Sequence, residues 1–246
     1  MDLNAGDGGE GGTEDAKSHN VLGLLLVDAG RFEDAEAEFR KAIEADSGYL
    51  EAHNNLGNLF AELRRFIEAE AEFRKAVELN PDYAEARYNL GVLLSELERF
   101  DEAEKEFRKA IDINPDFAEA HYCLGNLLKE LKVYDDAIRE FKKAIKINPD
   151  YLEAHSNLGL TFENLKMYDD AIKEFNKAID INQEYAEVHG NLGILLAKIG
   201  RKREAKPEFE TALRLFCEQG RDEDAKTVEK LIKKLDKKQD KKPNEI

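Results

Sequence analysis

Apolar residues recur along this chain three and four positions apart, with polar residues between them, and the whole pattern repeats every 34 residues. Glycine marks the recurrence most clearly, because it returns at that interval without slippage from Gly23 to Gly193. Within each interval, two sets of small or apolar residues recur three and four positions apart, which is the spacing of an amphipathic α-helix. A fixed period of this length predicts an array of helical units, each burying its apolar face against its neighbours.

The period defines six units, which are residues 16–49, 50–83, 84–117, 118–151, 152–185 and 186–219. Numbered 1 to 34 within a unit, positions 7, 8, 20, 24 and 27 hold Leu, Gly, Ala, Phe and Ala in all six. Small residues let two helices cross closely, while Leu and Phe fill the space beside the crossing. The first helix is expected to end at a polar break such as Arg64-Arg65. The second is expected to end at sequences such as Asn80-Pro81-Asp82, because proline cannot continue a helix.

Both ends of the chain depart from this pattern. Residues 1–15 contain five glycines and five acids with almost no apolar side chains, which predicts a disordered acidic tail. In the sixth unit, Pro207 falls inside the second helix, which is expected to run on to a stop at Gly220. Residues 220–238 predict an amphipathic helix that caps the last unit, followed by a disordered tail at residues 239–246.

These features resemble the tetratricopeptide repeat, a helix–turn–helix family with a 34-residue unit. The resemblance covers about residues 16–219 and implies an all-α fold, a right-handed superhelical solenoid of antiparallel helix pairs with a concave groove lined by the first helices. Two departures stand out. Position 4, where the family commonly has Trp, holds His in five units and Arg87 in the third. The family's Pro at position 32 is kept only as Pro81, Pro115 and Pro149.

The family places positions 2, 5, 6, 9, 12 and 13 in the groove, so the resemblance implies a peptide-binding site there. A row of asparagine amides can pair with the N–H and C=O groups of an extended peptide; alternatively, the asparagines are inherited consensus and bind nothing. The tyrosines at position 5 either anchor a partner side chain or cover helix contacts. The predicted peptide-binding residues are Asn54, Asn55, Asn58, Asn89, Asn126, Asn157, Asn191, Tyr88, Tyr122, Glu62, Glu96 and Glu130.

Charge narrows the class of partner. The formal net charge is −16, and residues 226–246 carry a net +4, which leaves −20 on residues 1–225. Such an acidic body repels phosphate backbones and argues against nucleic-acid binding. Ten acids and three lysines occupy the groove positions, which favours a basic or neutral peptide unless this is only a solvated face. The lysine-rich clamp by which chaperone-binding members of the family hold a carboxylate is missing here.

No pattern for catalysis, a cofactor or a metal is present. The five histidines recur once per unit, so neighbouring ones should lie on the order of 10 Å apart, whereas a shared zinc needs bonds of about 2.0–2.1 Å. We expect them to pack or to begin helices. Cys123 replaces an asparagine of the ladder and is expected to be a small buried thiol. The chain contains no phosphate loop and no nucleophile elbow.

We therefore predict a non-enzymatic scaffold that binds a peptide segment of a partner protein in an acidic, asparagine-lined groove. The alternative is a structural, self-associating repeat protein that uses its end surfaces or its basic tail. The first residues lack the basic and apolar regions of a signal peptide, and no apolar run approaches the roughly 20 residues that span a bilayer. These features favour a cytoplasmic location without membrane contact. The sequence does not determine the oligomeric state.

Overall fold

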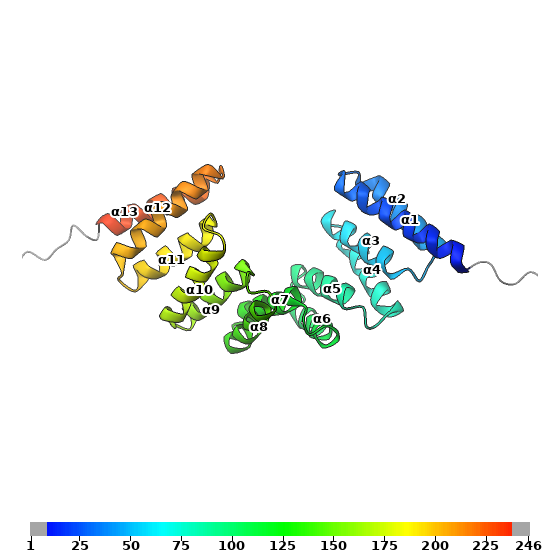
Figure 1. Ribbon diagram of the computed structural model, residues 1–246, viewed down its shortest axis with the longest axis horizontal. Helices are drawn as coiled ribbons and strands as arrows, with labels where there is room; N and C mark the ends of the chain where they lie inside the picture. Colours follow the sequence, from blue (N-terminus) through cyan, green and yellow to red (C-terminus); the bar gives the residue numbers. More distant parts are fainter. Residues whose placement is uncertain (1–8, 238–246) are drawn as a thin grey trace, which may run out of the picture. The chain divides into compact units, whose positions relative to one another are not determined.

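The structure is a computed structural model that describes residues 9–237, in which the regular secondary structure is α-helical and the helices form antiparallel pairs (Figure 1). The predicted tails at residues 1–8 and 239–246 lie outside the described residues. The helices are α1 (Gly9–Asp28), α2 (Phe32–Ala45), α3 (Leu50–Glu62), α4 (Phe66–Leu79), α5 (Ala84–Glu96), α6 (Phe100–Ile113), α7 (Ala118–Glu130), α8 (Tyr134–Ile147), α9 (Leu152–Asn164), α10 (Tyr168–Ile181), α11 (Ala186–Lys198), α12 (Lys202–Glu218) and α13 (Asp222–Lys237).

The described residues form two compact units, which divide within α7, between Cys123 and Leu124. In the first unit α1 packs on α2, α3 on α4 and α5 on α6, and α3 also contacts both α1 and α5. In the second unit α9 packs on α10, α11 on α12 and α12 on α13, and α9 contacts α11. Within each unit, these first helices of consecutive repeats are therefore neighbours, and this arrangement positions the candidate site.

The helix boundaries agree closely with the 34-residue period, since α3, α5, α7, α9 and α11 each begin on the first residue of a repeat. The prediction of a disordered tail over residues 1–15 is wrong for residues 9–15, because α1 begins at Gly9. The extra turns pack against the end of α2: a Cβ atom added at Gly12 would lie 3.0 Å from the carbonyl oxygen of Ala45, and Ala16 is fully buried. This contact supplies the tertiary packing that the composition of the segment does not predict.

The invariant glycine at position 8 and phenylalanine at position 24 form a single packing unit. In the fifth repeat, a Cβ atom on Gly159 would lie 2.7 Å from the Phe175 ring, which is closer than side chains approach one another. The same contact occurs in the other repeats, where the distances run from 2.5 to 2.8 Å. The glycine lets the ring approach the backbone of the first helix closely, and all six rings are almost completely buried.

The turn between the two helices of each repeat depends on one residue in the left-handed region at position 15. Here φ is 57° at Arg64, 57° at Glu98, 63° at Lys132 and 61° at Lys166, while the first and last repeats have glycine. The backbone N–H of Arg65 reaches back to the carbonyl of Phe60, and that of Arg64 to Ala61. These hydrogen bonds close the end of the first helix and confirm the predicted break at Arg64-Arg65.

A side-chain hydrogen bond closes the loop between consecutive repeats. It forms both in repeats that have proline at position 32 and in the fifth repeat, which does not. Asn80 Oδ1 accepts from the backbone N–H of Asp82 at 2.9 Å, and Asn182 Oδ1 accepts from that of Glu184 at the same distance. The second case lacks the proline, yet its loop is closed in the same way. An Asn or Asp side chain that mimics a backbone turn therefore ends the second helix. In the sixth repeat Phe216 takes this place, and α12 continues to Glu218 as predicted.

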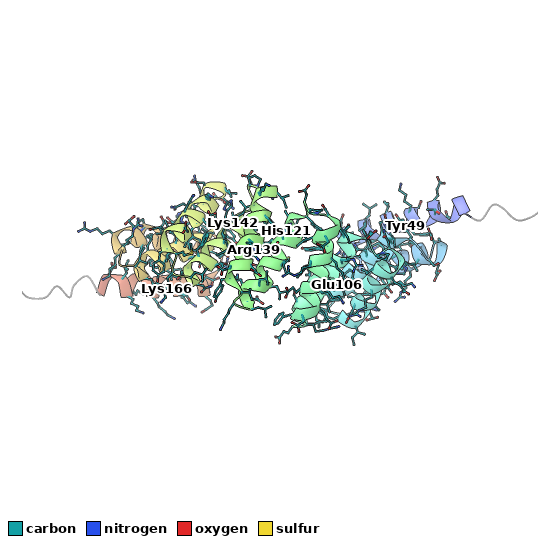
Figure 2. All side chains as sticks on the ribbon, turned by 90° about the horizontal axis from the view of Figure 1, so that it is seen from below. Tyr49, Glu106, His121, Arg139, Lys142 and Lys166 are labelled. Atoms are coloured by element: carbon teal, nitrogen blue, oxygen red, sulfur yellow. The ribbon has the colours of Figure 1, made fainter. Side chains whose placement is uncertain are left out.

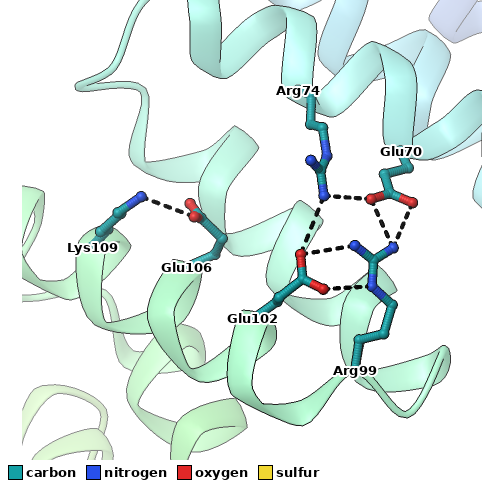
Figure 3. A network of polar contacts seen from close by, with 6 residues as sticks. All are labelled: Glu70, Arg74, Arg99, Glu102, Glu106 and Lys109. Atoms are coloured by element: carbon teal, nitrogen blue, oxygen red, sulfur yellow. Dashed lines mark hydrogen bonds and ion pairs between the residues drawn. The ribbon is translucent and has the colours of Figure 1, made fainter.

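Ion pairs on the second helices connect consecutive repeats (Figure 3). Arg99 contacts both Glu70 and Glu102 at 2.8 Å, and Arg74 contacts the same two carboxylates at 2.5 and 3.4 Å. Each exposed pair contributes little alone, but four charges in one network add specificity to the packing of α4 and α6. Side chains also cover helix junctions: Lys142 lies on α8 (Figure 2), and its ammonium is 5.6 Å from the centre of the Phe162 ring of α9. Across residues 9–237, no helix is both long and apolar enough to cross a membrane.

Candidate functional site

The histidines at position 4 bridge the two helices of their repeat and the loop before it. His155 Nδ1 lies 2.7 Å from Glu174 Oε2, and its Nε2 lies 3.1 Å from the carbonyl oxygen of Pro149. His189 repeats this geometry with Glu208 and Gln183 at the same two distances. We name this three-way contact the position-4 clasp. It confirms that these histidines begin and pack their helices; in the described part of the chain, no cluster of three or more metal-ligating side chains occurs.

Arg87 makes the same two contacts in the third repeat, where histidine is absent. Its Nη1 donates to Glu106 Oε2 at 2.7 Å and its Nε donates to the carbonyl of Pro81 at 2.7 Å. Both acceptors are oxygens that carry no proton, so the planar guanidinium of Arg87 can donate a hydrogen bond to each of them. The clasp is a structural device, and it leaves position 4 out of the candidate binding surface.

The predicted asparagine ladder is in part bonded within the chain. Asn54 is only 1% exposed; its amide donates to Glu85 at 3.2 Å and its oxygen accepts from Asn89 at 2.9 Å. Asn55 donates to Asn20 of the preceding repeat at 3.0 Å. Asn54 therefore cannot reach a ligand, which corrects its predicted role, and it orients Asn89 instead. Asn55 and Asn89 are half-buried, and each amide retains bonding capacity beyond these contacts.

Four of the predicted residues meet in one hollow of about 210 Å³ between α3 and α5, which we name the acidic hollow. Its lining consists of Asn58, Ala61, Glu62, Phe73, Asn89, Val92, Leu93 and Glu96. Four of these lining residues are apolar, and we refer to them as the floor; the other four are polar. Glu62 and Glu96 are exposed, and neither forms an ion pair with another described residue. The hollow can therefore offer two unneutralised carboxylates, two amides and an apolar floor to a ligand.

Tyr88 packs within the chain more than its predicted anchoring role implies. Its ring centre lies 4.9 Å from that of Phe117 and 6.2 Å from that of Phe107, both in tilted geometry. The Cys123 thiol donates to the Tyr88 hydroxyl at 3.8 Å. Burial raises the pKa of the Cys123 thiol, as expected for a structural cysteine. Tyr88 is half-buried, so the alternative that it covers a helix junction has the better support.

The remaining predicted residues also lie on the first helices. Lys129 donates to Asn157 Oδ1 at 2.6 Å, and burial lowers the pKa of this lysine. Asn126 is half-buried, and its side-chain oxygen has no hydrogen-bond partner within residues 9–237. Tyr122 and Asn191 are also half-buried, and Glu130 is exposed.

Reasoning from the sequence missed two features. Glutamate occupies position 23 in all six repeats, at a constant 19 residues after position 4, and this spacing could have revealed the clasp. A second hollow lies in the other compact unit, lined in part by Ile194, Lys198 and Lys234. The first two fall at groove positions 9 and 13, but the third comes from α13, outside the 34-residue period.

Comparison with protein families matches tetratricopeptide repeat models along almost the whole helical array. Models described as tetratricopeptide repeat match residues 16–49, 48–116, 106–139, 152–185 and 186–216, and one described as TPR repeat matches residues 126–166. A comparison with curated proteins gives no match.

Several solved structures share the fold. PilF of Pseudomonas aeruginosa is 23% identical, with a TM-score of 0.77 over 89% of this chain and 99% of PilF. MamA is 28% identical, with a TM-score of 0.60 over 71% of this chain and 95% of MamA. YrrB, described as a TPR protein with an unusual peptide-binding site, is 27% identical, with a TM-score of 0.58 over 71% of this chain and 90% of YrrB.

Proposed function

Because the chain belongs to the tetratricopeptide repeat family, whose members mediate protein–protein interactions, we propose that it is a non-enzymatic scaffold that binds an extended, basic or neutral segment of a partner protein. The acidic hollow between α3 and α5 is the centre of the proposed site. The description of YrrB as a peptide-binding protein supports a ligand of this class.

The observation that carries the proposal is the pair of exposed carboxylates, Glu62 and Glu96, on the flanks of an apolar floor. A volume of about 210 Å³ suits a single long side chain. The stem of a lysine or arginine can lie along Val92 and Leu93 while its charged head lies between the two glutamates. Asn58 and Asn89 then face the ligand backbone, to which their amides can both donate and accept hydrogen bonds.

Selection of a random peptide library on the full chain tests this proposal. The selected peptides should be enriched in Lys or Arg next to apolar residues, and their binding should weaken with added salt. The E62Q/E96Q variant keeps the shape of the hollow and removes both charges, so binding should weaken by about tenfold. D82N/D116N is the matched control, because it removes two exposed carboxylates of the same compact unit outside the hollow and should leave binding unchanged.

Peptides without basic residues, or equal binding by the wild type and E62Q/E96Q, would refute the role of the acidic hollow. Weakening by the control variant to the same degree would show that the ligand responds only to overall charge.

A second candidate function, self-association, is favoured by the uncovered face of α1. Leu25 is 60% exposed, whereas Leu59 at the same position of the next repeat is 2% exposed. Val21, Leu22 and Leu24 are also exposed on this helix. In later repeats the preceding helix pair covers the equivalent leucines, so the face of α1 is suited to packing against another apolar helix.

Sedimentation velocity over a range of concentrations tests self-association through this face. The wild type should form a larger species as concentration rises, and L25K should remain a monomer. I67K is the matched control, because Ile67 is an isolated apolar residue with 86% exposure. A wild type that stays monomeric at every concentration would exclude this second function.

A further inference from the structure

The second hollow lies in the C-terminal compact unit, where α13 packs against the last repeat. Its volume is about 330 Å³, and its lining comes from α11, α12 and α13. We name it the basic hollow, because three of its lining residues are lysines and none is acidic. The lining residues are Ile194, Ala197, Lys198, Lys202, Phe209, Leu231, Lys234 and Leu235.

The basic and acidic hollows occupy related places with opposite charge. Position 13 is Lys198 in the last repeat and Glu62 in the second, and position 9 is Ile194 in place of Asn58. The phenylalanine of position 24 lines both hollows. In the last repeat α13 supplies the remaining wall, as α5 does in the acidic hollow. The amides and carboxylates of the acidic hollow are thus replaced by apolar and cationic side chains in the basic hollow.

The positive charge of the basic hollow is only partly neutralised from within the chain. Lys198 pairs with Glu163 at 2.9 Å, which fixes its ammonium group at one edge. Lys234 is exposed and forms no ion pair with the residues that the structure describes, although its neighbour Lys233 pairs with Glu229 at 3.5 Å. Lys206 of α12 and Asp236 of α13 pair at 3.0 Å, and Leu235, next to Lys234, is buried.

We propose that the basic hollow is a second peptide-binding site, which takes an apolar side chain flanked by carboxylates from an acidic segment of a partner protein. Phe209, Leu231 and Leu235 provide an apolar floor for a ring or branched chain, and the volume exceeds that of the acidic hollow. The surrounding ammonium groups complement carboxylates beside that side chain, whereas they repel the basic segment proposed for the other site. The inference does not depend on the function of the acidic hollow.

Fluorescence anisotropy with a defined acidic peptide tests this site. The probe is a fluorescein-labelled peptide of sequence GSDEFDESG, titrated with the full-length chain. The wild type should bind it, and K234E should weaken binding by about tenfold or more through like-charge repulsion. K230E is the matched control, because Lys230 is exposed on the same helix outside the hollow and carries the same change in charge. E62Q/E96Q should bind the probe as the wild type does, which separates this test from that of the acidic hollow.

Replacement of the probe's phenylalanine by alanine should abolish measurable binding, because the apolar side chain fills the floor. Equal weakening by K230E and K234E, or equal binding of the alanine probe, would overturn the proposal and leave only diffuse charge attraction. Failure of the wild type to bind the probe would also overturn it. Binding of dodecanoate in place of the peptide, detected by calorimetry and lost in K234E, would assign the hollow to a fatty acid instead. Circular dichroism of each variant checks that α13 remains folded.

Discussion

Replacement of His155 provides the sharpest test of the position-4 clasp. His155→Ala removes the imidazole contacts with Glu174 Oε2 and with the carbonyl oxygen of Pro149, at 2.7 and 3.1 Å. The side chains of His155 and Glu174 are only 4% and 10% exposed, so water cannot fully replace the lost bonds. A hydrogen bond to a charged group contributes about 1.5–3 kcal/mol and a neutral one about 0.5–1.5 kcal/mol, so the free energy of unfolding should fall by roughly 2–4 kcal/mol.

His155→Arg should cost less than about 1 kcal/mol, because Arg87 makes the same two contacts in the third repeat. Urea denaturation followed by circular dichroism gives the free energy, and hydrogen exchange measured by mass spectrometry locates the change. Exchange should increase first in α9 and α10, because each repeat contacts only its neighbours. The argument fails if His155→Ala unfolds with the wild-type midpoint, or if His155→Arg is as destabilised as His155→Ala.

Three further predictions follow from the packing, the turns and the charges. Gly159→Ala should lower the free energy of unfolding by about 1–3 kcal/mol, since its Cβ would lie 2.7 Å from the Phe175 ring. Gly190→Ala, which meets nothing within 4 Å, should raise it by about 0.5–1 kcal/mol; equal effects would refute the packing argument. Lys166→Gly should raise the urea midpoint, because φ is 61° there, and a lower midpoint would contradict this reasoning. Burial raises the pKa of Glu174, but hydrogen bonds from His155 and Lys177 outweigh burial and lower it overall. The resulting stabilisation should be present above about pH 4.5 and be lost as pH falls through the lower folded pKa, and Glu174→Gln should remove this part of the acid sensitivity in urea titrations at several pH values.

The fold could be predicted from the sequence because one set of packing rules is repeated six times. Gly159 and Phe175 illustrate this, since their contact is local to one repeat and recurs at a fixed spacing. The start of α1 could not be predicted, because the residues that stabilise it lie at the end of α2 and the segment itself has the composition of a tail.

The candidate site was less predictable than the fold. Residues on the same face of a helix share a spacing, but the spacing does not say which amides bond to each other. Asn54, Asn58 and Asn89 all belong to the predicted ladder, yet Asn54 is buried, whereas Asn58 and Asn89 line the acidic hollow. The basic hollow combines Lys198 with Lys234 of α13, and no repeat period relates these two residues.

The position-4 clasp has a consequence for how arrays of this kind can change length. It joins two side chains of one repeat to a main-chain oxygen of the repeat before it, as with His121 and the carbonyl of Pro115 at 3.1 Å. Main-chain oxygen is the same whichever residue carries it, so whole units can be lost or duplicated without loss of the joint. If residues 84–117 were deleted, the carbonyl oxygen of Pro81 would take the place of that of Pro115 beside His121. The folded, shortened chain should then have the same helicity per residue as the full chain. The contact between Asn54 and Asn89 depends on side-chain identity, so a change of length would preserve the architecture while it altered which side chains pair along the first helices.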